Sequence, residues 1–205
     1  MEELGRGLEG VVYKVGNQAR KTFFSSKPFD DNAYIVASRL SLLSLSTITR
    51  PLKLHYNEAG DLIGYDMKLL PKDKGKVSEM EIDKLLVNIH NIRKDLDTLT
   101  FHNILVKDLH RHNIAVNGDN IYVFDFGFYR YEPDSEHVGE YNNKQLDLLI
   151  GYDSLVVEEY DMDPRDVSYL LYHPFLASRE KYIEEYIDKE INGKYKTLKQ
   201  YIRRQ

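Results

Sequence analysis

The segment that constrains the fold most is VKDLHRHNIAVNGDNIYVFDFG, at residues 106–127. Two short runs within it, residues 114–116 and 121–124, are rich in the β-branched and aromatic residues that favour strands. The sequence NGDN at 117–120 lies between the two runs, and an Asn-Gly pair in that position is a strong signal for a tight turn. The segment therefore predicts an antiparallel hairpin.

Three polar residues flank this predicted hairpin. Asp108 and Asn113 precede its first strand, and Asp125 follows its second strand. The hairpin would bring the amide of Asn113 and the carboxylate of Asp125 together, and oxygen ligands so placed suit Mg²⁺ with room for phosphate oxygens. Asp108, in a loop, is a candidate base for a hydroxyl group. Alternatively, these are ordinary turn residues, a hypothesis that must explain each residue separately.

A glycine pattern, G-x-G-x-x-G, occurs near the start of the chain in LGRGLEGVVYKV, residues 4–15. This spacing is found in dinucleotide-binding turns that open a helix, in hairpins that cover nucleotide phosphates, and in plain flexible turns. Here residues 11–15 read as a strand, residues 16–17 as a turn and residues 18–24 as the returning strand. Because no helix follows Gly10, the sequence favours the hairpin over the dinucleotide turn.

The returning strand carries Lys21 on the same face as Ala19 and Phe23, because side chains on a strand alternate between its faces. A lysine that points inward is costly unless it meets an anion. The alternative is an edge strand with Lys21 in water. Taken alone, the strand favours the edge-strand alternative.

The rest of the chain reads as further helices and strands. Polar caps and helical periodicity predict helices at 30–45, with Asp30 and Asp31 as N-caps, and at 78–99, with Ser78 and Glu81 as a capping box. Residues 51–56 and 62–69 read as strands joined by the turn NEAGD. Three more helices are predicted, at 143–150, 164–172 and 178–205.

Taken together, these motifs resemble the protein-kinase-like superfamily in order and spacing. The matching residues are the glycine loop with its valine (Gly5, Gly7, Gly10, Val12), Ala19-Arg20-Lys21, the D-x-x-x-x-N pair Asp108 and Asn113, and Asp125-Phe126-Gly127. The resemblance implies an α+β, bilobal kinase-like domain over residues 1–205. Its small antiparallel N-lobe would span 1–70, and its reduced, mostly helical C-lobe 71–205.

The resemblance also implies a division of labour around ATP and Mg²⁺. Lys21 would bind the α- and β-phosphates, Asp125 and Asn113 would hold magnesium ions, and Asp108 would act as catalytic base. Backbone amides of the glycine loop would cradle the phosphates. The remaining predicted nucleotide-binding residues would enclose adenine or lie at the lobe connection: Val12, Ala19, Ala115 and Met67.

The chain departs from the kinase pattern in several places. Val106-Lys107 stands where the family has His-Arg, His110 replaces a lysine, and no Ala-Pro-Glu follows Gly127. The helix predicted after Lys21 contains no glutamate to pair with it. Asp30 and Asp31 are better explained as helix caps than as partners of Lys21.

Composition narrows the classes of partner. The net charge of −5 does not favour nucleic-acid binding, and the chain has no cysteine and no apolar run of membrane-spanning length, which predicts a cytoplasmic protein without membrane contact. Histidines 90, 102, 110 and 112 match no common zinc spacing. The basic C-terminal stretch, 194–205, is better explained as a solvated helix face than as a binding tail.

Three hypotheses on function follow. The favoured one is a Mg-ATP-dependent protein serine/threonine kinase, with a regulatory protein partner as a further hypothesis. The second is the same chemistry on a small-molecule hydroxyl, as in aminoglycoside kinases, which the triplet Asp108-Leu109-His110 favours. The third is a nucleotide-binding pseudokinase scaffold, favoured by the missing helix glutamate.

Overall fold

The computed structural model describes residues 2–7, 9–24, 31–71, 80–109 and 113–148, and every structural statement below concerns these residues. The helices predicted at 164–172 and 178–205, and the basic stretch at 194–205, lie outside them. The architecture is α+β, with a five-stranded antiparallel sheet and three helices among the described residues.

The sheet contains the first five strands in the order β1-β2-β3-β5-β4. Their bounds are β1 Glu2–Arg6, β2 Gly10–Val15, β3 Gln18–Phe23, β4 Pro51–Tyr56 and β5 Leu62–Lys68. Gly16 and Gly60 have positive φ angles of 62° and 87° in the turns that connect β2 to β3 and β4 to β5, where glycine is favoured. The strands predicted at 11–15, 18–24, 51–56 and 62–69 are confirmed as β2, β3, β4 and β5, each to within one residue at either end.

The strand register defines two faces of the sheet. Val12, Lys21 and Tyr65 form one cross-strand row, because Lys21 pairs with Val12 on β2 and with Tyr65 on β5. Ala19 and Met67 pair two positions away and therefore lie on the same face. This face is covered by the core, since Ala19, Lys21 and Tyr65 are all buried.

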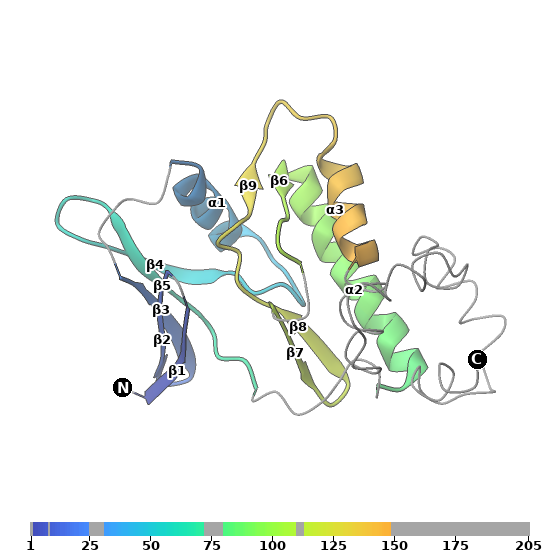
Figure 1. Ribbon diagram of the computed structural model, residues 1–205, viewed down its shortest axis with the longest axis horizontal. Helices are drawn as coiled ribbons and strands as arrows, with labels where there is room; N and C mark the ends of the chain where they lie inside the picture. The colour runs from blue at the N-terminus through green and yellow to red at the C-terminus, as the bar shows by residue number, and fades with distance from the viewer. Residues whose placement is uncertain (1, 8, 25–30, 72–79, 110–112, 149–205) are drawn as a thin grey trace, which may run out of the picture.

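The described residues form three helices, α1 Asp31–Leu42, α2 Ile82–Phe101 and α3 Val138–Leu148. α1 packs against β4 of the large sheet, and α2 and α3 pack against each other. In Figure 1, α1 lies beside β4 and β9, while α2 and α3 lie side by side on the other side of the molecule. α1 ends three residues before the predicted end. The predicted capping box is wrong, because α2 begins at Ile82 and Glu81 is its N-cap.

Two small two-stranded sheets lie between the large sheet and α2 (Figure 1). The predicted hairpin is confirmed as β7 Ile114–Asn117 and β8 Asn120–Val123. The second, unpredicted, pairs β6 Ile104–Leu105 with β9 Arg130–Tyr131. Asn88 of α2 fixes the first hairpin, since its side chain accepts a hydrogen bond from the Ile121 N–H (2.8 Å) and donates one to the Asp119 carbonyl (2.7 Å).

One continuous apolar core joins these parts. It includes buried residues of the sheet, of α1, of α2, of the β7–β8 hairpin and of α3: Tyr65, Leu40, Leu96, Val123 and Leu146 are examples. Burial of such side chains is the main stabilising term in folding. Within the described part of the chain, none of the helices combines the length and the apolar character needed to cross a bilayer.

Candidate functional site

Lys21 lies at the centre of the candidate site, with a side chain only 9% exposed. Its Nζ donates hydrogen bonds to Glu9 Oε2 at 3.0 Å and to Asp125 Oδ1 at 3.1 Å. β3 lies in the middle of the sheet, so the alternative of Lys21 in water on an edge strand is wrong. Instead the inward lysine meets two carboxylates.

These neighbours keep the Lys21 ammonium charged. Burial by itself would lower the pKa of this group, because a charge is less stable away from water. The electrostatic influence of Tyr65, Asp125 and Glu9, with the hydrogen bond to Glu9, outweighs burial and raises the pKa of Lys21 above its ordinary value. The site therefore presents a permanent cation beneath the glycine-rich turn.

Glu9 is the residue that the sequence analysis missed. It lies between β1 and β2, within the glycine-rich turn, and supplies the carboxylate that the following helix lacks. The turn is fixed by hydrogen bonds from the Gly7 N–H to the Gly10 carbonyl and from the Phe24 N–H to the Glu9 carbonyl, both 3.0 Å. The acid is visible in the sequence, but only the folded hairpin shows that it reaches Lys21. Asp30 and the side chain of Asp31 are not described.

Gly10 has a packing role that the other two glycines of the pattern lack. A Cβ at Gly10 would collide with the carbonyl of Thr22 on β3. A Cβ at Gly5 or Gly7 would meet nothing within 4 Å. The pattern therefore combines one glycine needed for strand packing with two whose backbone is open to an approaching group.

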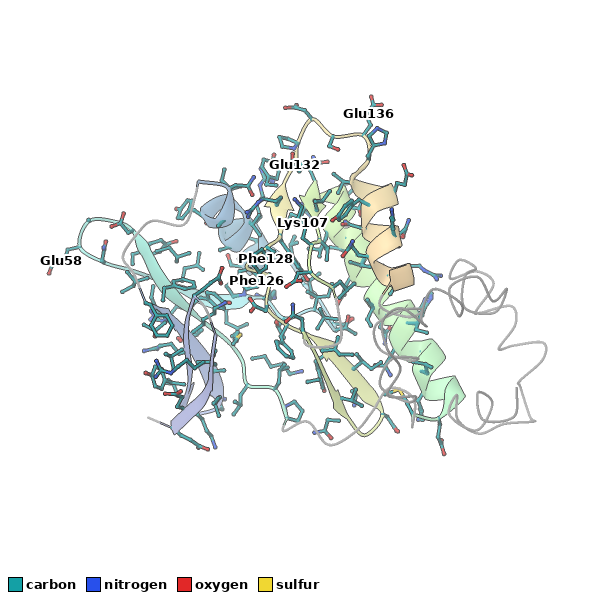
Figure 2. The ribbon with its side chains drawn as sticks, in the orientation of Figure 1. Glu58, Lys107, Phe126, Phe128, Glu132 and Glu136 are labelled. Carbon is teal, nitrogen blue, oxygen red and sulfur yellow. The ribbon has the colours of Figure 1, made fainter. Side chains whose placement is uncertain are left out.

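Asp125 is held in a sharp turn by its neighbour Phe126. The Asp125 backbone is left-handed, with φ of 65°, and its Oδ1 also accepts a hydrogen bond from the Gly127 N–H at 3.3 Å. Phe126 is 7% exposed, and its ring packs against the Tyr65 ring at a tilt of 34° with centroids 4.8 Å apart. Figure 2 shows Phe126 between the sheet and the helices. Burying the phenylalanine thus directs the aspartate towards Lys21.

Asp108 and Asn113 form a second pair. The Asn113 amide donates to the Asp108 carbonyl at 2.9 Å and to Asp108 Oδ2 at 3.0 Å. Asp108 is exposed and also left-handed, with φ of 64°, while the next residue, Leu109, is buried. The Phe124 N–H donates to the Asn113 carbonyl at 2.8 Å. The hairpin therefore brings Asn113 next to the residue preceding Asp125.

The residues expected around adenine come from two parts of the fold. Val12, Ala19 and Met67 share the sheet face of Lys21, and Ala115 is buried on β7. Ala115 pairs with Tyr122, and the Lys68 ammonium lies 4.7 Å from the centroid of the Tyr122 ring. The end of β5 therefore lies close to the β7–β8 hairpin, at the level of the pair formed by Ala115 and Tyr122.

The metal hypotheses rest on few ligands. Among the described residues, no group of three or more His, Asp or Glu side chains is arranged to hold a metal ion. Two members of the histidine set, 110 and 112, lie outside those residues. The donors that remain are the 40%-exposed carboxylate of Asp125 and the Asn113 amide. Such a sparse oxygen set fits Mg²⁺, which takes few protein ligands and shares the rest with phosphate and water.

Comparison with known proteins gives one relative. The protein named "Putative serine/threonine-protein kinase L670", from Acanthamoeba polyphaga mimivirus, is 30% identical over 152 residues, which cover 69% of this chain. The match spans only 28% of the mimivirus protein. No protein-family model matches the chain.

Proposed function

We propose that this chain is a Mg-ATP-dependent phosphotransferase with the bilobal architecture of the protein-kinase-like superfamily, and that it phosphorylates serine or threonine hydroxyls of a protein. The observation that carries the proposal is the contact between Lys21 and Asp125, 3.1 Å apart and 104 positions apart in sequence. A charged lysine beside a carboxylate that fits Mg²⁺ is a site for a metal-bound phosphate chain.

In this proposal the chain's residues bind and orient the nucleotide. Mg-ATP supplies the transferable phosphoryl group and the cation that neutralises its charge. Lys21 binds phosphate oxygens, and Asp125 with Asn113 holds Mg²⁺. The backbone at Gly5 and Gly7 lies over the phosphates, where the open space around both residues supports a close approach. Val12, Ala19, Met67 and Ala115 contribute apolar surface to adenine.

Asp108 acts on the acceptor in the same proposal. Its exposed carboxylate orients the substrate hydroxyl and accepts its proton, while the two hydrogen bonds from Asn113 hold the loop in place. The name of the mimivirus relative, a serine/threonine-protein kinase, supports a protein hydroxyl rather than a small-molecule hydroxyl as the acceptor. Lys21, Asp108, Asn113 and Asp125, one or more of which an inactive kinase-like protein usually lacks, are all present, which favours catalysis over a scaffold role.

The test is incubation with γ-labelled ATP and Mg²⁺, alone and with cell lysate, followed by separation of labelled protein from labelled small molecules. The wild type should label protein on serine or threonine. D108N should transfer roughly 10²–10⁴-fold more slowly, because it removes the proton acceptor and no metal contact. D134N, at an exposed aspartate, is the matched control and should behave as the wild type.

Two results would change the proposal. Label that appears only in small molecules would support the small-molecule kinase hypothesis. A wild type no faster than D108N would contradict phosphotransfer and favour the scaffold.

A further inference from the structure

Glu9 occupies a position on Lys21 that a ligand phosphate would need. An ammonium group has three N–H donors, and here one points to Glu9 and one to Asp125. The Lys21 side chain is 9% exposed, whereas that of Glu9 is 36% exposed. Glu9 therefore reaches the buried lysine from a more exposed position, as does Asp125 at 40% exposed, and a nucleotide that enters from solvent would meet both carboxylates.

Charge makes the two anions competitors. Two carboxylates around one ammonium leave this cluster with an excess negative charge, so a phosphate group that approaches Lys21 is repelled by Glu9. Asp125 can exchange the lysine for a metal ion that accompanies the phosphate. The proposed function gives Glu9 no such role, because its metal ligands are Asp125 and Asn113.

The glycine-rich turn is held independently of the Glu9 carboxylate. A Cβ at Gly127 would lie 2.9 Å from Glu9 Oε2, so the lack of a side chain at Gly127 leaves the space that this carboxylate fills. Lys21 is the ion-pair partner of Glu9, and the main chain of the turn is fixed separately through the carbonyls of Glu9 and Gly10. The side chain can thus leave without breaking the turn.

We propose that Glu9 is a residue that determines nucleotide affinity: it takes the place of a phosphate on Lys21 in the ligand-free chain and is displaced when a magnesium-bound polyphosphate enters. This inference rests on the proposed function. The alternative is that Glu9 stays on Lys21 and positions it, in place of the absent helix glutamate. In that case, removing the charge of Glu9 should weaken Mg-ATP binding instead of strengthening it.

The experiment is calorimetric titration of Mg-ATP into the wild type, E9Q and E58Q. E9Q should bind about fivefold more tightly, the affinity equivalent of about 1 kcal/mol for a partly exposed ion pair that no longer has to be broken. E58Q removes the same charge at the exposed turn between β4 and β5, far from Phe126 in Figure 2, and should bind as the wild type does.

Thermal unfolding gives a second readout that also shows whether E9Q is folded. Without nucleotide, E9Q should melt at a lower temperature than the wild type, because Lys21 loses an ion pair. The increase in melting temperature on adding Mg-ATP should be larger for E9Q than for the wild type.

The outcomes separate this inference from the proposed function. A wild type that binds Mg-ATP, with E9Q equal or weaker, would overturn the displacement of Glu9 and leave the phosphotransferase standing. Lack of Mg-ATP binding by both the wild type and E9Q would contradict the proposed function and this inference with it.

Discussion

At the scale of single residues, Asp108 and Asp125 share an uncommon backbone. Both are left-handed, with φ of 64° and 65°, a conformation that costs residues with a side chain roughly 1–2 kcal/mol. Each is followed by a buried apolar residue, Leu109 or Phe126, 3% and 7% exposed. Burial of Leu109 and Phe126 holds the two aspartates in this conformation. A strained backbone of this kind is often found at functional sites.

Asp66 provides a prediction about stability. Arg20 donates to both Asp66 oxygens, at 2.6 and 3.0 Å, and these hydrogen bonds lower the pKa of the Asp66 carboxyl to about 2. D66N should therefore reduce the free energy of unfolding at neutral pH by about 2 kcal/mol. Urea denaturation measures this difference.

The sign of the pH dependence follows from the direction of this shift. A carboxyl with a lowered pKa stabilises the fold above its unfolded-state pKa and loses that contribution as pH falls towards its folded-state pKa. The gap between wild type and D66N should thus narrow between about pH 4 and about pH 2. D134N, at an exposed aspartate, is the control. A gap that stays constant with pH would refute the role given to the Asp66 charge.

At the scale of elements, Asp95 of α2 connects the helix to the segment after α1. Its buried carboxylate accepts hydrogen bonds from the backbone N–H groups of Ser46, Thr47 and Ile48, at 2.7–3.0 Å. The same segment pairs with β8, since the Thr49 N–H donates to the Val123 carbonyl. Asp95 therefore supports the strand that leads into Asp125.

D95N should destabilise the protein by about 3 kcal/mol, because an amide group accepts fewer hydrogen bonds and buried N–H groups lose their acceptor. The matched control is D97N, at an exposed position on the same helix, with an expected change within about 0.5 kcal/mol. Chemical denaturation of both variants makes the comparison. Equal free energies of unfolding for the two variants would show that the hydrogen bonds from residues 46–48 to Asp95 do not stabilise the fold.

The segment after Gly127 is another element-scale feature. The Asn32 side chain donates to the Tyr131 carbonyl at 3.1 Å and accepts from the Tyr131 N–H at 3.0 Å, so α1 holds β9 directly. The Arg39 guanidinium also lies 3.9 Å from the centroid of the Tyr131 ring. These contacts fix the segment through neutral and cation–π interactions rather than through a phosphate group.

Activity should therefore not depend on phosphorylation of this segment. Lys107, beside Asp108, is a point charge without the planar fork with which arginine grips phosphate. Glu132 and Glu136, labelled in Figure 2, would repel a phosphate on Ser135. Phosphatase-treated protein and S135A should transfer label as fast as untreated wild type. Loss of most activity on dephosphorylation, restored by autophosphorylation, would contradict this account.

At the scale of the whole molecule, local patterns predicted more of the fold than of the site. Turn chemistry at Gly16 and in the 117–120 turn fixed the hairpins, since these signals act between neighbours in sequence. β6 and β9 are two residues each, and even their nearest pair, Leu105 and Arg130, is 25 positions apart in sequence. So short a strand has no periodicity of its own, and only the tertiary fold forms it.

The sequence predicted the residues of the site as separate motifs, but only the folded structure shows which carboxylates contact Lys21. The kinase resemblance implied that Lys21 binds phosphate, and in the fold its ammonium also pairs with Glu9, twelve residues earlier. The family pattern places this carboxylate on the helix that follows, where the sequence has no glutamate. α2 begins at Ile82, four residues later than predicted, with Glu81 as its N-cap, and Ser78, the predicted cap, lies outside the described residues.

The most direct test of the central claim is the Mg-ATP affinity of the wild type and D125A, measured by calorimetry with D134N as control. The claim is that Lys21 and Asp125 form one site for a metal-bound phosphate chain. It predicts tight, magnesium-dependent binding by the wild type and D134N, and loss of magnesium-dependent binding by D125A, because the phosphate chain loses the cation that neutralises it. Equal affinity of D125A and wild type for Mg-ATP would contradict the claim.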